Sequence, residues 1–348
     1  MAPRPTHNPP NRFHATRVEL DAPEDARLEV YEERARSIVT ENDSPDVGFR
    51  FSVNPYRGCF HGCIYCYARP THQYLDFGAG TDFDRKIVVK VNAPELLEQK
   101  LASRGWGFET IAFSGNTDCY QPLEARYELT RRCLEACARW QNPVTVITKG
   151  TLIRRDAALL GTLAAGAGCH VNVSAAFTDE ALRKVFDPFA PPIEARFETM
   201  RQLAEAGVPV GVAVAPIFPG VNDAMIPELL ERAHAAGART AFMTLARLTG
   251  EVAAHFASEV QAGLPAALAR KVERGLRAAR GGALTDVRFG RRMGGAGARW
   301  NVVEQLFELH VRRLGMSAGE LPAAPERTNA PRRGAGQLGL DFGQDVGE

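Results

Sequence analysis

NPYRGCFHGCIYCYARP, residues 54–70, is the stretch that decides what kind of protein this 348-residue chain forms. It holds Cys59, Cys63 and Cys66 in the spacing C-x3-C-x2-C. Cysteine thiolates hold 4Fe-4S clusters, and a cluster that only carries electrons normally takes four of them. This stretch provides three. It therefore predicts a cluster with one iron open to a small molecule, much as catalytic metal sites keep one coordination position free.

Two other interpretations of the three cysteines are open. A structural zinc site would take His61 or a distant cysteine as its fourth ligand. Disulfide pairing fits less well, because the total of seven cysteines is odd and these three are very close together. Residues 1–10 lack the apolar region of a signal peptide, so we expect a reducing, cytoplasmic location. The other cysteines are scattered along the chain: Cys119, Cys133, Cys137 and Cys169.

Composition and charge narrow the functional classes. No apolar run approaches the roughly 20 residues of a membrane helix, so we expect no membrane contact. The net charge of +1 hides a basic region over residues 268–313, where eleven Lys and Arg residues and four Asp and Glu residues give an excess of seven. With Trp300 inside it, this region indicates contact with nucleic-acid phosphates and a stacking partner for a base. The simpler interpretation is the solvated face of a helix.

Short apolar segments alternate with amphipathic helical patterns from residue 49 to residue 245. Strands that are apolar throughout, each followed by a helix, are typical of a parallel sheet covered on both faces. Six repeats of this unit predict an α/β fold built as a complete or partial (β/α) barrel. The expected core strands are 49–56, 111–115, 144–148, 170–177, 208–218 and 240–245, with a further strand at 87–92 and a helix over 124–140.

The chain divides into four expected parts. Residues 1–45 are predicted to form a flexible arm with a short helix over 26–39, and residues 46–248 the barrel. Residues 249–320 are expected to be a helical, basic extension. Residues 321–348 are rich in Pro, Ala, Gly and Arg, which predicts a disordered tail.

The cysteine stretch resembles the cluster loop of the radical S-adenosylmethionine (SAM) superfamily, whose motif is C-x3-C-x-aromatic-C, with Tyr65 in the aromatic place. The resemblance implies a 4Fe-4S cluster on the three cysteines and SAM chelating the open iron. It implies that an electron from a donor such as flavodoxin or ferredoxin cleaves SAM to methionine and a 5'-deoxyadenosyl radical, which abstracts hydrogen from a substrate. It also selects the partial (β/α)6 barrel of TIM type, with 87–92 as an accessory strand.

Parallel barrels place their chemistry at the C-terminal ends of the strands. The superfamily approaches the SAM amino group after the second core strand, and further polar and charged groups would hold the carboxylate and the ribose. Solvated, turn or capping roles are the alternative for each such residue. The residues expected here are Ser114, Gly115, Asn116, Thr117 and Asp118 for the amino group, Lys149 and Arg196 for the carboxylate, and Asn172 and Ser174 for the ribose.

Within the superfamily, residues 48–245 are most similar to the spore photoproduct lyase group, which reverses thymine dimers in spore DNA. The similarity rests on the cysteine stretch, on Asp118 of NTDCYQPLE, on Lys149 of TKG and on DPFAPPIEAR at 187–196. Aligning on Asp118 and Lys149 puts Gly115 where that lyase has its hydrogen-donor cysteine, while Cys119 lies on the other side of Asp118. The resemblance therefore implies radical SAM chemistry more strongly than it implies that substrate.

The tail contains QLGLDF, residues 337–342, which resembles the short peptide that binds the bacterial sliding clamp. A disordered segment of this kind places apolar side chains in a preformed pocket, here Leu338, Leu340 and Phe342, with Gln337 as a hydrogen-bonding anchor. The alternative is that the tail packs on its own barrel.

Three functional classes remain. The first is a radical SAM enzyme acting on nucleic acid, in DNA repair or base modification. The second is a non-catalytic iron-sulfur or zinc module that responds to redox state, and the third is a radical SAM enzyme acting on a peptide or small molecule. Only the first and third predict cleavage of SAM.

Overall fold

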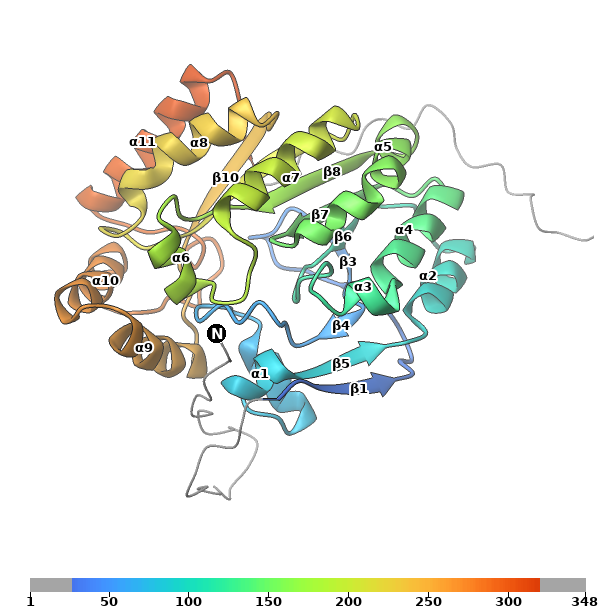
Figure 1. Cartoon of the computed structure of the whole chain (residues 1–348), viewed down its shortest axis with the longest axis horizontal. Helices are drawn as coiled ribbons and strands as arrows, with labels where there is room; N and C mark the ends of the chain where they lie inside the picture. Colours follow the sequence, from blue (N-terminus) through green and yellow to red (C-terminus); the bar gives the residue numbers. More distant parts are fainter. Residues whose placement is uncertain (1–26, 320–348) are drawn as a thin grey trace, which may run out of the picture.

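A curved sheet of eight strands lies at the centre of the computed structural model, which describes residues 27–319 (Figure 1). Its order is β11-β10-β9-β8-β7-β6-β3-β2, so strands that follow one another in the chain are neighbours in the sheet. The core strands are parallel and mostly buried, which explains their apolar sequences. They are β3 (Phe51–Val53), β6 (Ile111–Phe113), β7 (Val144–Thr148), β8 (Cys169–Ser174), β9 (Val210–Ile217) and β10 (Thr240–Leu245).

The sheet is open rather than closed. At one edge β2 (Val39–Glu41) pairs antiparallel with β3, and at the other β11 (Ser317–Ala318) pairs with the start of β10. Within residues 27–319 these two edge strands do not pair with each other. The structure therefore has the partial (β/α) barrel that the sequence predicted.

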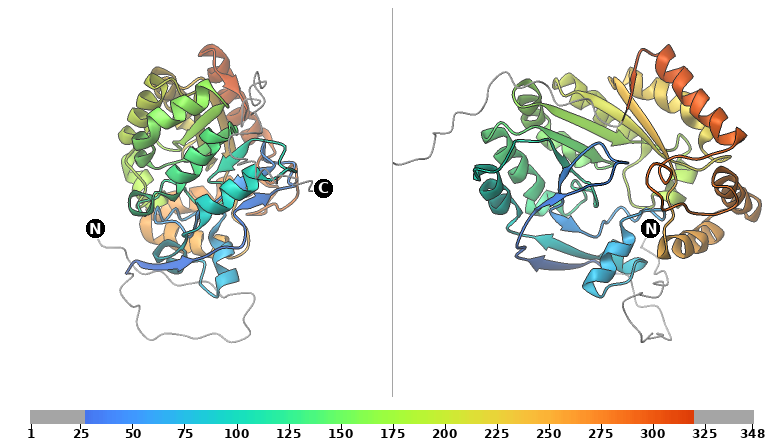
Figure 2. Two further views of the ribbon diagram at one scale, coloured as in Figure 1. Left: turned by 90° about the vertical axis from the view of Figure 1, so that its right-hand side faces the viewer. Right: turned by 180° about the vertical axis from the view of Figure 1, so that it is seen from behind.

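Helices follow the core strands and cover the outer face of the sheet (Figures 1 and 2). Each of these helices packs an apolar face toward the core. In α4 (Leu129–Arg139), for example, Cys133, Leu134 and Cys137 recur at the spacing of one helical face and are all buried. These cysteines therefore belong to the core. The outer helices include α2 (Ala93–Ala102), α4 (Leu129–Arg139), α5 (Ala157–Ala165), α7 (Ile193–Glu205) and α8 (Ile226–Ala235).

A second sheet, of order β1-β5-β4, is smaller (Figure 1). Its central strand β5 (Lys86–Lys90) is the accessory strand expected at 87–92, and β4 (Tyr56–Arg57) leads into the cysteine stretch. The helix predicted over 26–39 is wrong, because that segment forms β1 (Glu29–Glu33) and the start of β2. β1 pairs in parallel with β5, and the backbone hydrogen-bond partners that β5 provides outweigh the local preference of this segment for a helix. Ordered structure thus begins before the predicted boundary at residue 45.

The helix predicted over 124–140 is interrupted. α3 (Glu124–Tyr127) ends at Glu128, which adopts a left-handed conformation with φ 51°, and α4 then begins. The buried carboxylate of Glu124 accepts hydrogen bonds from the backbone N–H groups of Thr130, at 2.9 Å, and Arg131, at 3.1 Å. These bonds satisfy donors in the first turn of α4, so the interruption is a built helix cap.

A helical extension follows the barrel, as the sequence predicted. It consists of α9 (Glu251–Gly263), α10 (Ala266–Ala279) and α11 (Ala298–Arg313). Phe256 of α9 stacks on Phe218, with ring centroids 5.4 Å apart, and so joins the extension to the barrel core. None of the helices among residues 27–319 combines the length and apolar character needed to cross a bilayer. The predicted tail with its QLGLDF motif lies outside the described residues.

Candidate functional site

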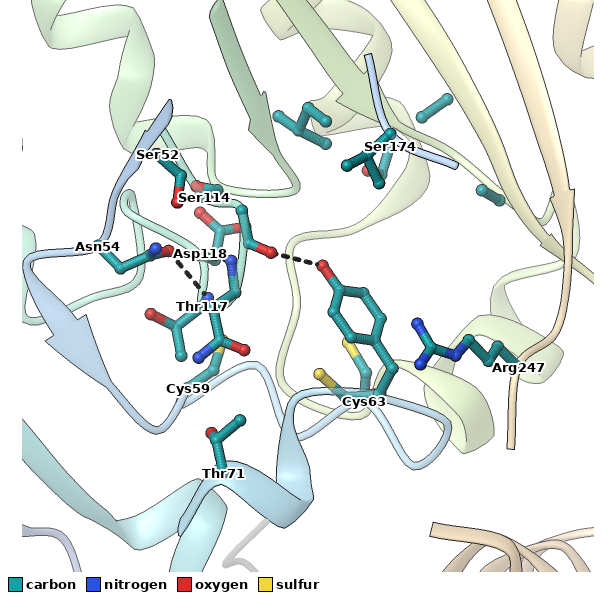
Figure 3. A pocket seen from close by; sticks show the side chains of 18 of the residues that line it. Ser52, Asn54, Cys59, Cys63, Thr71, Ser114, Thr117, Asp118, Ser174 and Arg247 are labelled. Atoms are coloured by element: carbon teal, nitrogen blue, oxygen red, sulfur yellow. Dashed lines mark hydrogen bonds between the residues drawn. The ribbon is translucent and has the colours of Figure 1, made fainter. Parts of the chain in front are cut away.

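A cavity of about 670 Å³ opens at the C-terminal ends of the core strands (Figure 3). All three cysteines of the 54–70 stretch line it; Cys59 and Cys63 are buried, and Cys66 is partly buried. The barrel wall contributes residues from every core strand or the turn after it: Ser52, Ser114, Thr148, Ser174, Ala213 and Leu245. The chain thus brings its cysteine loop to the edge where parallel barrels carry their chemistry.

Two glycines let the cysteine loop turn tightly. Gly58 has φ +80°, and a Cβ there would lie 2.8 Å from the carbonyl oxygen of Phe83. Gly62 has φ +66°, and a Cβ there would lie 2.8 Å from the ring of Phe189. Both positions combine a left-handed backbone with crowding, which only glycine accepts without strain.

Side chains from distant segments fix the backbone of the cysteine loop. Gln121 accepts a hydrogen bond from the N–H of Phe60 at 3.1 Å and donates one to the carbonyl of Gly58 at 3.0 Å. Arg69 is fully buried and donates from Nε to the carbonyl of Cys63 at 3.0 Å. Its other end pairs with Asp84 at 2.9 Å. The loop is therefore held in one shape by buried polar contacts.

The three cysteines that line the cavity are the candidate ligands of the predicted cluster. In the part of the chain that the structure describes, no three His, Cys, Asp or Glu side chains are gathered around one point as ligands of a metal ion. A cube of iron and sulfur takes one thiolate at each of three corners, so three separate cysteines that line one cavity fit the predicted cluster.

Asp118 joins the loop after β6 to the end of β7. Its Oδ1 accepts a hydrogen bond from the hydroxyl of Thr148 at 2.6 Å, and its Oδ2 accepts one from the N–H of Lys149 at 2.8 Å. Nδ1 of His61 lies 3.3 Å from Oδ2. Burial raises the pKa of Asp118, but His61 and the hydrogen bonds outweigh it and hold this pKa well below its usual range.

His61 lies inside the cysteine stretch and is buried. Burial lowers its pKa, but Cys59 and Asp118 favour the protonated ring more strongly and raise the pKa to about 10. The sequence offered His61 as a fourth zinc ligand. The structure gives it an ion-pair partner instead, since its Nδ1 faces the Asp118 carboxylate.

The loop formed by residues 114–118 lies along the cavity, and all five of its residues line it. Asn54 holds this loop, because its Oδ1 accepts hydrogen bonds from the N–H groups of Asn116 at 2.9 Å and Thr117 at 3.4 Å (Figure 3). Gly115 is packed closely, and a Cβ there would lie 3.1 Å from that of Ser52. Its carbonyl accepts a hydrogen bond from Tyr67 at 2.8 Å.

Tyr65, the aromatic residue of the cysteine motif, is tied to a buried ion pair. Its hydroxyl donates a hydrogen bond to Oδ1 of Asp187, and the guanidinium of Arg196 binds Oδ2 with both terminal nitrogens at 3.1 Å. Arg196 also donates to the carbonyl of Ser174, and it does not line the cavity. The sequence had suggested that Arg196 contacts a cofactor carboxylate directly, and the structure does not place it for such a contact. The guanidinium of Arg196 is already bound by the carboxylate of Asp187.

Lys149 does line the cavity. Its Nζ lies 5.7 Å from the centroid of the Tyr65 ring. Burial lowers its pKa, but Cys63 and Asp187 outweigh burial and raise the pKa, so the side chain is a partly buried cation. The charged groups near it are Cys63, Asp187, Arg196 and Asp118.

The two candidates on β8 differ in position. Ser174, at the end of the strand, lines the cavity. Asn172 lies two residues deeper, is fully buried and contacts Nδ1 of His170 at 3.3 Å. Asn172 is not part of the cavity lining, so the expectation that it contacts a ribose is not supported by its position.

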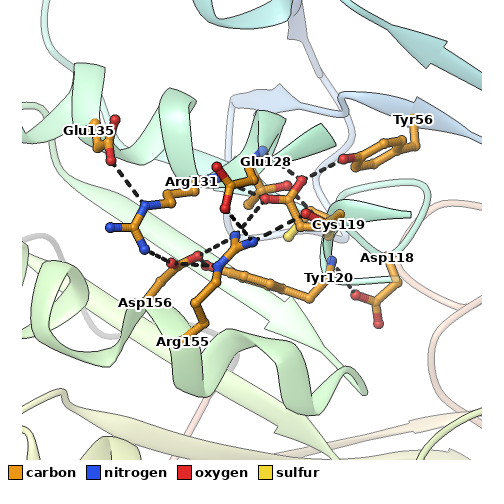
Figure 4. Close-up of polar contacts among 11 residues, drawn as sticks. Tyr56, Asp118, Cys119, Tyr120, Glu128, Arg131, Glu135, Arg155 and Asp156 are labelled. Carbon is orange, nitrogen blue, oxygen red and sulfur yellow. Dashed lines mark hydrogen bonds and ion pairs between the residues drawn. The ribbon is translucent and has the colours of Figure 1, made fainter. Parts of the chain in front are cut away.

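A buried polar network supports the loops from behind (Figure 4). Tyr56, from the start of the cysteine stretch, donates from its hydroxyl to Glu124 at 2.5 Å. Arg155 binds Glu124 at 2.9 Å and Asp156 at 2.9 Å, and Tyr120 donates to Asp156 at 3.1 Å. Because these contacts are buried, removing one member would leave charges without partners.

Several residues that shape the site were not recognised from the sequence. The supporting residues Asn54, Gln121, Glu124 and Asp187 all lie within the quoted motifs NPYRGC, NTDCYQPLE and DPFAPPIEAR, so the motifs marked the right segments without revealing each role. Arg247 follows β10 and lines the cavity. Its position just after a core strand was the only feature of the sequence that could have identified it as a site residue.

Comparison with known proteins identifies the family. The model of the radical SAM superfamily matches residues 53–233, which include the three cysteines and all the residues that the sequence predicted to contact SAM. The uncharacterized protein Rv2578c of Mycobacterium tuberculosis is 42% identical over 192 residues, 55% of this chain and 56% of that protein. The uncharacterized protein MJ0683 of Methanocaldococcus jannaschii is 27% identical over 198 residues, 57% of this chain and 71% of that protein. The chain thus spans about half the length of the mycobacterial relative.

Solved structures of spore photoproduct lyase share the fold. A complex of that lyase with dinucleoside spore photoproduct superposes with a TM-score of 0.63 at 15% identity, covering 84% of this chain and 82% of the lyase chain. A doubly substituted mutant of the lyase, with bound AdoMet and the dinucleoside spore photoproduct, gives a TM-score of 0.64 at 15% identity, covering 87% of each chain.

Proposed function

Because the chain belongs to the radical SAM superfamily, we propose that it is an enzyme that holds a 4Fe-4S cluster on Cys59, Cys63 and Cys66 and cleaves SAM to act on nucleic acid. The observation that carries this proposal is that all three cysteines, the 114–118 loop and Lys149 line one cavity of about 670 Å³. When bound, the cluster and SAM supply a 5'-deoxyadenosyl radical that abstracts hydrogen.

The remaining roles belong to the protein. The cysteine thiolates bind three irons, and the loop around them is fixed by Gln121 and Arg69. Lys149 is a partly buried cation beside the cysteines and suits the SAM carboxylate. The polar groups of residues 114–118 suit its amino group, and Ser174 suits a ribose hydroxyl.

Arg196 and Tyr65 act by positioning. Arg196 neutralises Asp187, which accepts the hydrogen bond of the Tyr65 hydroxyl. The tyrosine ring in turn lies beside Lys149. Cys63 and Cys66 flank Tyr65 closely in the chain, so this arrangement orients the cysteine loop relative to the cation that we assign to SAM.

Two features support a nucleic-acid substrate. The extension over residues 268–313 carries an excess of seven positive charges. Trp300, which the sequence suggested as a stacking partner, is buried in the structure and is not available to stack on a base. The fold is shared with spore photoproduct lyase, whose solved complex contains dinucleoside spore photoproduct. The reaction of that lyase does not transfer directly, however. In our alignment, Gly115 of this chain takes the place of the cysteine that donates hydrogen in the lyase. Cys119 is fully buried and does not line the cavity.

Partners are also proposed. An electron donor such as flavodoxin or ferredoxin would reduce the cluster, and QLGLDF would bind a sliding clamp through Gln337, Leu338, Leu340 and Phe342.

The decisive experiment is anaerobic incubation of reconstituted protein with SAM and dithionite, scored for 5'-deoxyadenosine. Formation of this product in wild-type protein, and its loss in Cys63→Ala, would support the enzyme. A protein that carries an intact cluster but never forms the product would instead be a redox module.

A further inference from the structure

The cavity lining carries more positive than negative charge. Five Lys and Arg side chains and two carboxylates line it, together with His61, which pairs with Asp118. Both carboxylates are already bound, Glu41 by Arg50 at 2.7 Å and Asp118 by His61 and its hydrogen bonds. The five cations are Arg57, Lys90, Lys149, Arg247 and Arg292.

Among these five cations, in the part of the chain that the structure describes, Arg247 is distinguished by a buried donor that has neither an acceptor nor an ion-pair partner. Lys90 donates from Nζ to the carbonyl of Asn54 at 3.0 Å, and Arg292 is bound by Asp46. Within residues 27–319, Arg247 forms no ion pair, and its Nε is buried without a hydrogen-bond acceptor. A buried donor of this kind costs free energy unless a ligand supplies the acceptor.

The position of Arg247 points to a ligand that enters from the mouth of the cavity. The residue follows β10, and its side chain points toward the cysteine loop (Figure 3). Its Cζ lies 6.0 Å from the centroid of the Tyr67 ring, and Tyr67 is 48% exposed. Lys149, in contrast, lies beside the buried Tyr65 on the other side of Cys66 in the motif. Lys149 therefore lies beside the buried ring of Tyr65, and Arg247 lies beside the solvent-exposed ring of Tyr67.

The basic extension holds this part of the cavity wall. The N–H of Leu245 donates to the carbonyl of Met293 at 2.9 Å, and Arg280 donates to the carbonyl of Ala246 at 2.9 Å. Burial and the neighbouring Arg292 both lower the pKa of Arg247, although Asp46 already pairs with Arg292. An anion at this place would therefore be attracted chiefly by Arg247.

We infer that Arg247 binds a phosphate oxygen of the substrate nucleic acid at the cavity mouth, with Tyr67 beside it as a stacking surface for a base. The inference rests on the proposed nucleic-acid substrate and assigns one residue to it. A guanidinium donates two parallel hydrogen bonds to phosphate, and an exposed aromatic ring stacks on any base. A single nucleotide offers both groups.

The test measures binding of a short, fluorescent, single-stranded oligonucleotide to reconstituted protein. We expect Arg247→Ala to weaken binding about tenfold or more, as for loss of a charge-assisted hydrogen bond. Arg247→Gln serves as a second variant that keeps a polar side chain. The charge-matched control is Arg104→Ala, an exposed arginine in the loop before β6, at the opposite end of the strands from the cavity. It should change affinity less than about twofold.

Oligonucleotides with one neutral methylphosphonate linkage identify the anion. Wild-type protein should lose affinity at one linkage position, and the Arg247 variants should show no further loss there. Uncoupled formation of 5'-deoxyadenosine should stay unchanged in the control variant Arg104→Ala. If the Arg247 variants bind the oligonucleotide normally, or bind SAM more weakly instead, the inference is overturned while the enzyme assignment stands. If wild-type protein binds no oligonucleotide yet cleaves SAM, the nucleic-acid substrate itself is refuted.

Discussion

The backbone N–H of Lys149 donates a hydrogen bond of 2.8 Å to Oδ2 of Asp118. Through this bond the loop after β6 and the end of β7 form one wall of the cavity, although the two residues are 31 positions apart. The hydroxyl of Thr148 binds the other carboxylate oxygen at 2.6 Å. Asp118 thus positions the lysine that we assign to SAM.

Asp118→Asn should loosen this wall. The substitution keeps the shape, but it removes the charge that pairs with His61 and places an NH2 group opposite donors. Hydrogen bonds to charged groups are each worth about 1.5–3 kcal/mol, so the free energy of unfolding should fall by about 2–4 kcal/mol. Urea unfolding measures this change. Glu205→Gln, an exposed carboxylate on α7, should unfold like wild-type protein; an equal effect at both sites would contradict the role of Asp118.

Lys149→Ala should retain the cluster and weaken SAM binding. Removing one partner of a partly buried ion pair costs a few kcal/mol, which corresponds to a loss of affinity of about a hundredfold. Equilibrium binding of SAM to the reconstituted variant measures the loss, and the cluster absorbance provides the control for assembly. Unchanged SAM affinity would remove Lys149 from the site.

Replacing Cys59, Cys63 or Cys66 singly by Ala should abolish the 4Fe-4S cluster, because each holds one corner of the cube. Iron and acid-labile sulfide contents, measured after anaerobic reconstitution, report cluster assembly. Cys169→Ala is the matched control, since Cys169 begins β8 and does not line the cavity. Stoichiometric zinc without sulfide in wild-type protein would replace the cluster assignment with the structural zinc alternative.

Arg196→Met should destabilise the fold while leaving the cysteines intact. The substitution leaves the fully buried carboxylate of Asp187 without its ion-pair partner. Removing one partner of a buried ion pair typically costs about 3–5 kcal/mol of folding free energy. Thermal and urea unfolding would detect this loss. The double variant Arg196→Met with Asp187→Asn should recover part of the stability, because the orphaned charge is then gone. Failure to recover would mean that packing, rather than charge, explains the single variant.

The basic extension and the tail should act separately. If the 268–313 region contacts phosphates, affinity for duplex DNA should fall with salt at a log-log slope of about −0.9 per neutralised phosphate. Replacing Gln337, Leu340 and Phe342 together by Ala should remove binding to a sliding clamp and leave SAM cleavage unchanged. Finding neither salt-dependent binding nor clamp association would favour a peptide or small-molecule substrate.

The sequence alone determined the cysteine spacing, the alternation of apolar strands and helices, and so the partial barrel with its chemistry at the strand ends. Local pattern sufficed because those strands are buried on both faces and each is followed by a helix with one apolar side. It misjudged residues 26–39, because only the edge of β5 makes that segment a strand. It also missed the interruption at Glu128, which depends on the buried Glu124 carboxylate.

Tertiary structure decided which polar residues are available to a ligand. Lys149 and Arg196 looked alike in sequence, yet Asp187 binds the arginine while the lysine lines the cavity. Asn172 and Ser174 share a strand, but only Ser174 lies at its open end. Arg247 became a candidate ligand-binding residue only in the folded structure, where its Nε is buried without a hydrogen-bond acceptor. The availability of a charge depends on partners that are distant in the chain, so residue type and spacing alone do not determine it.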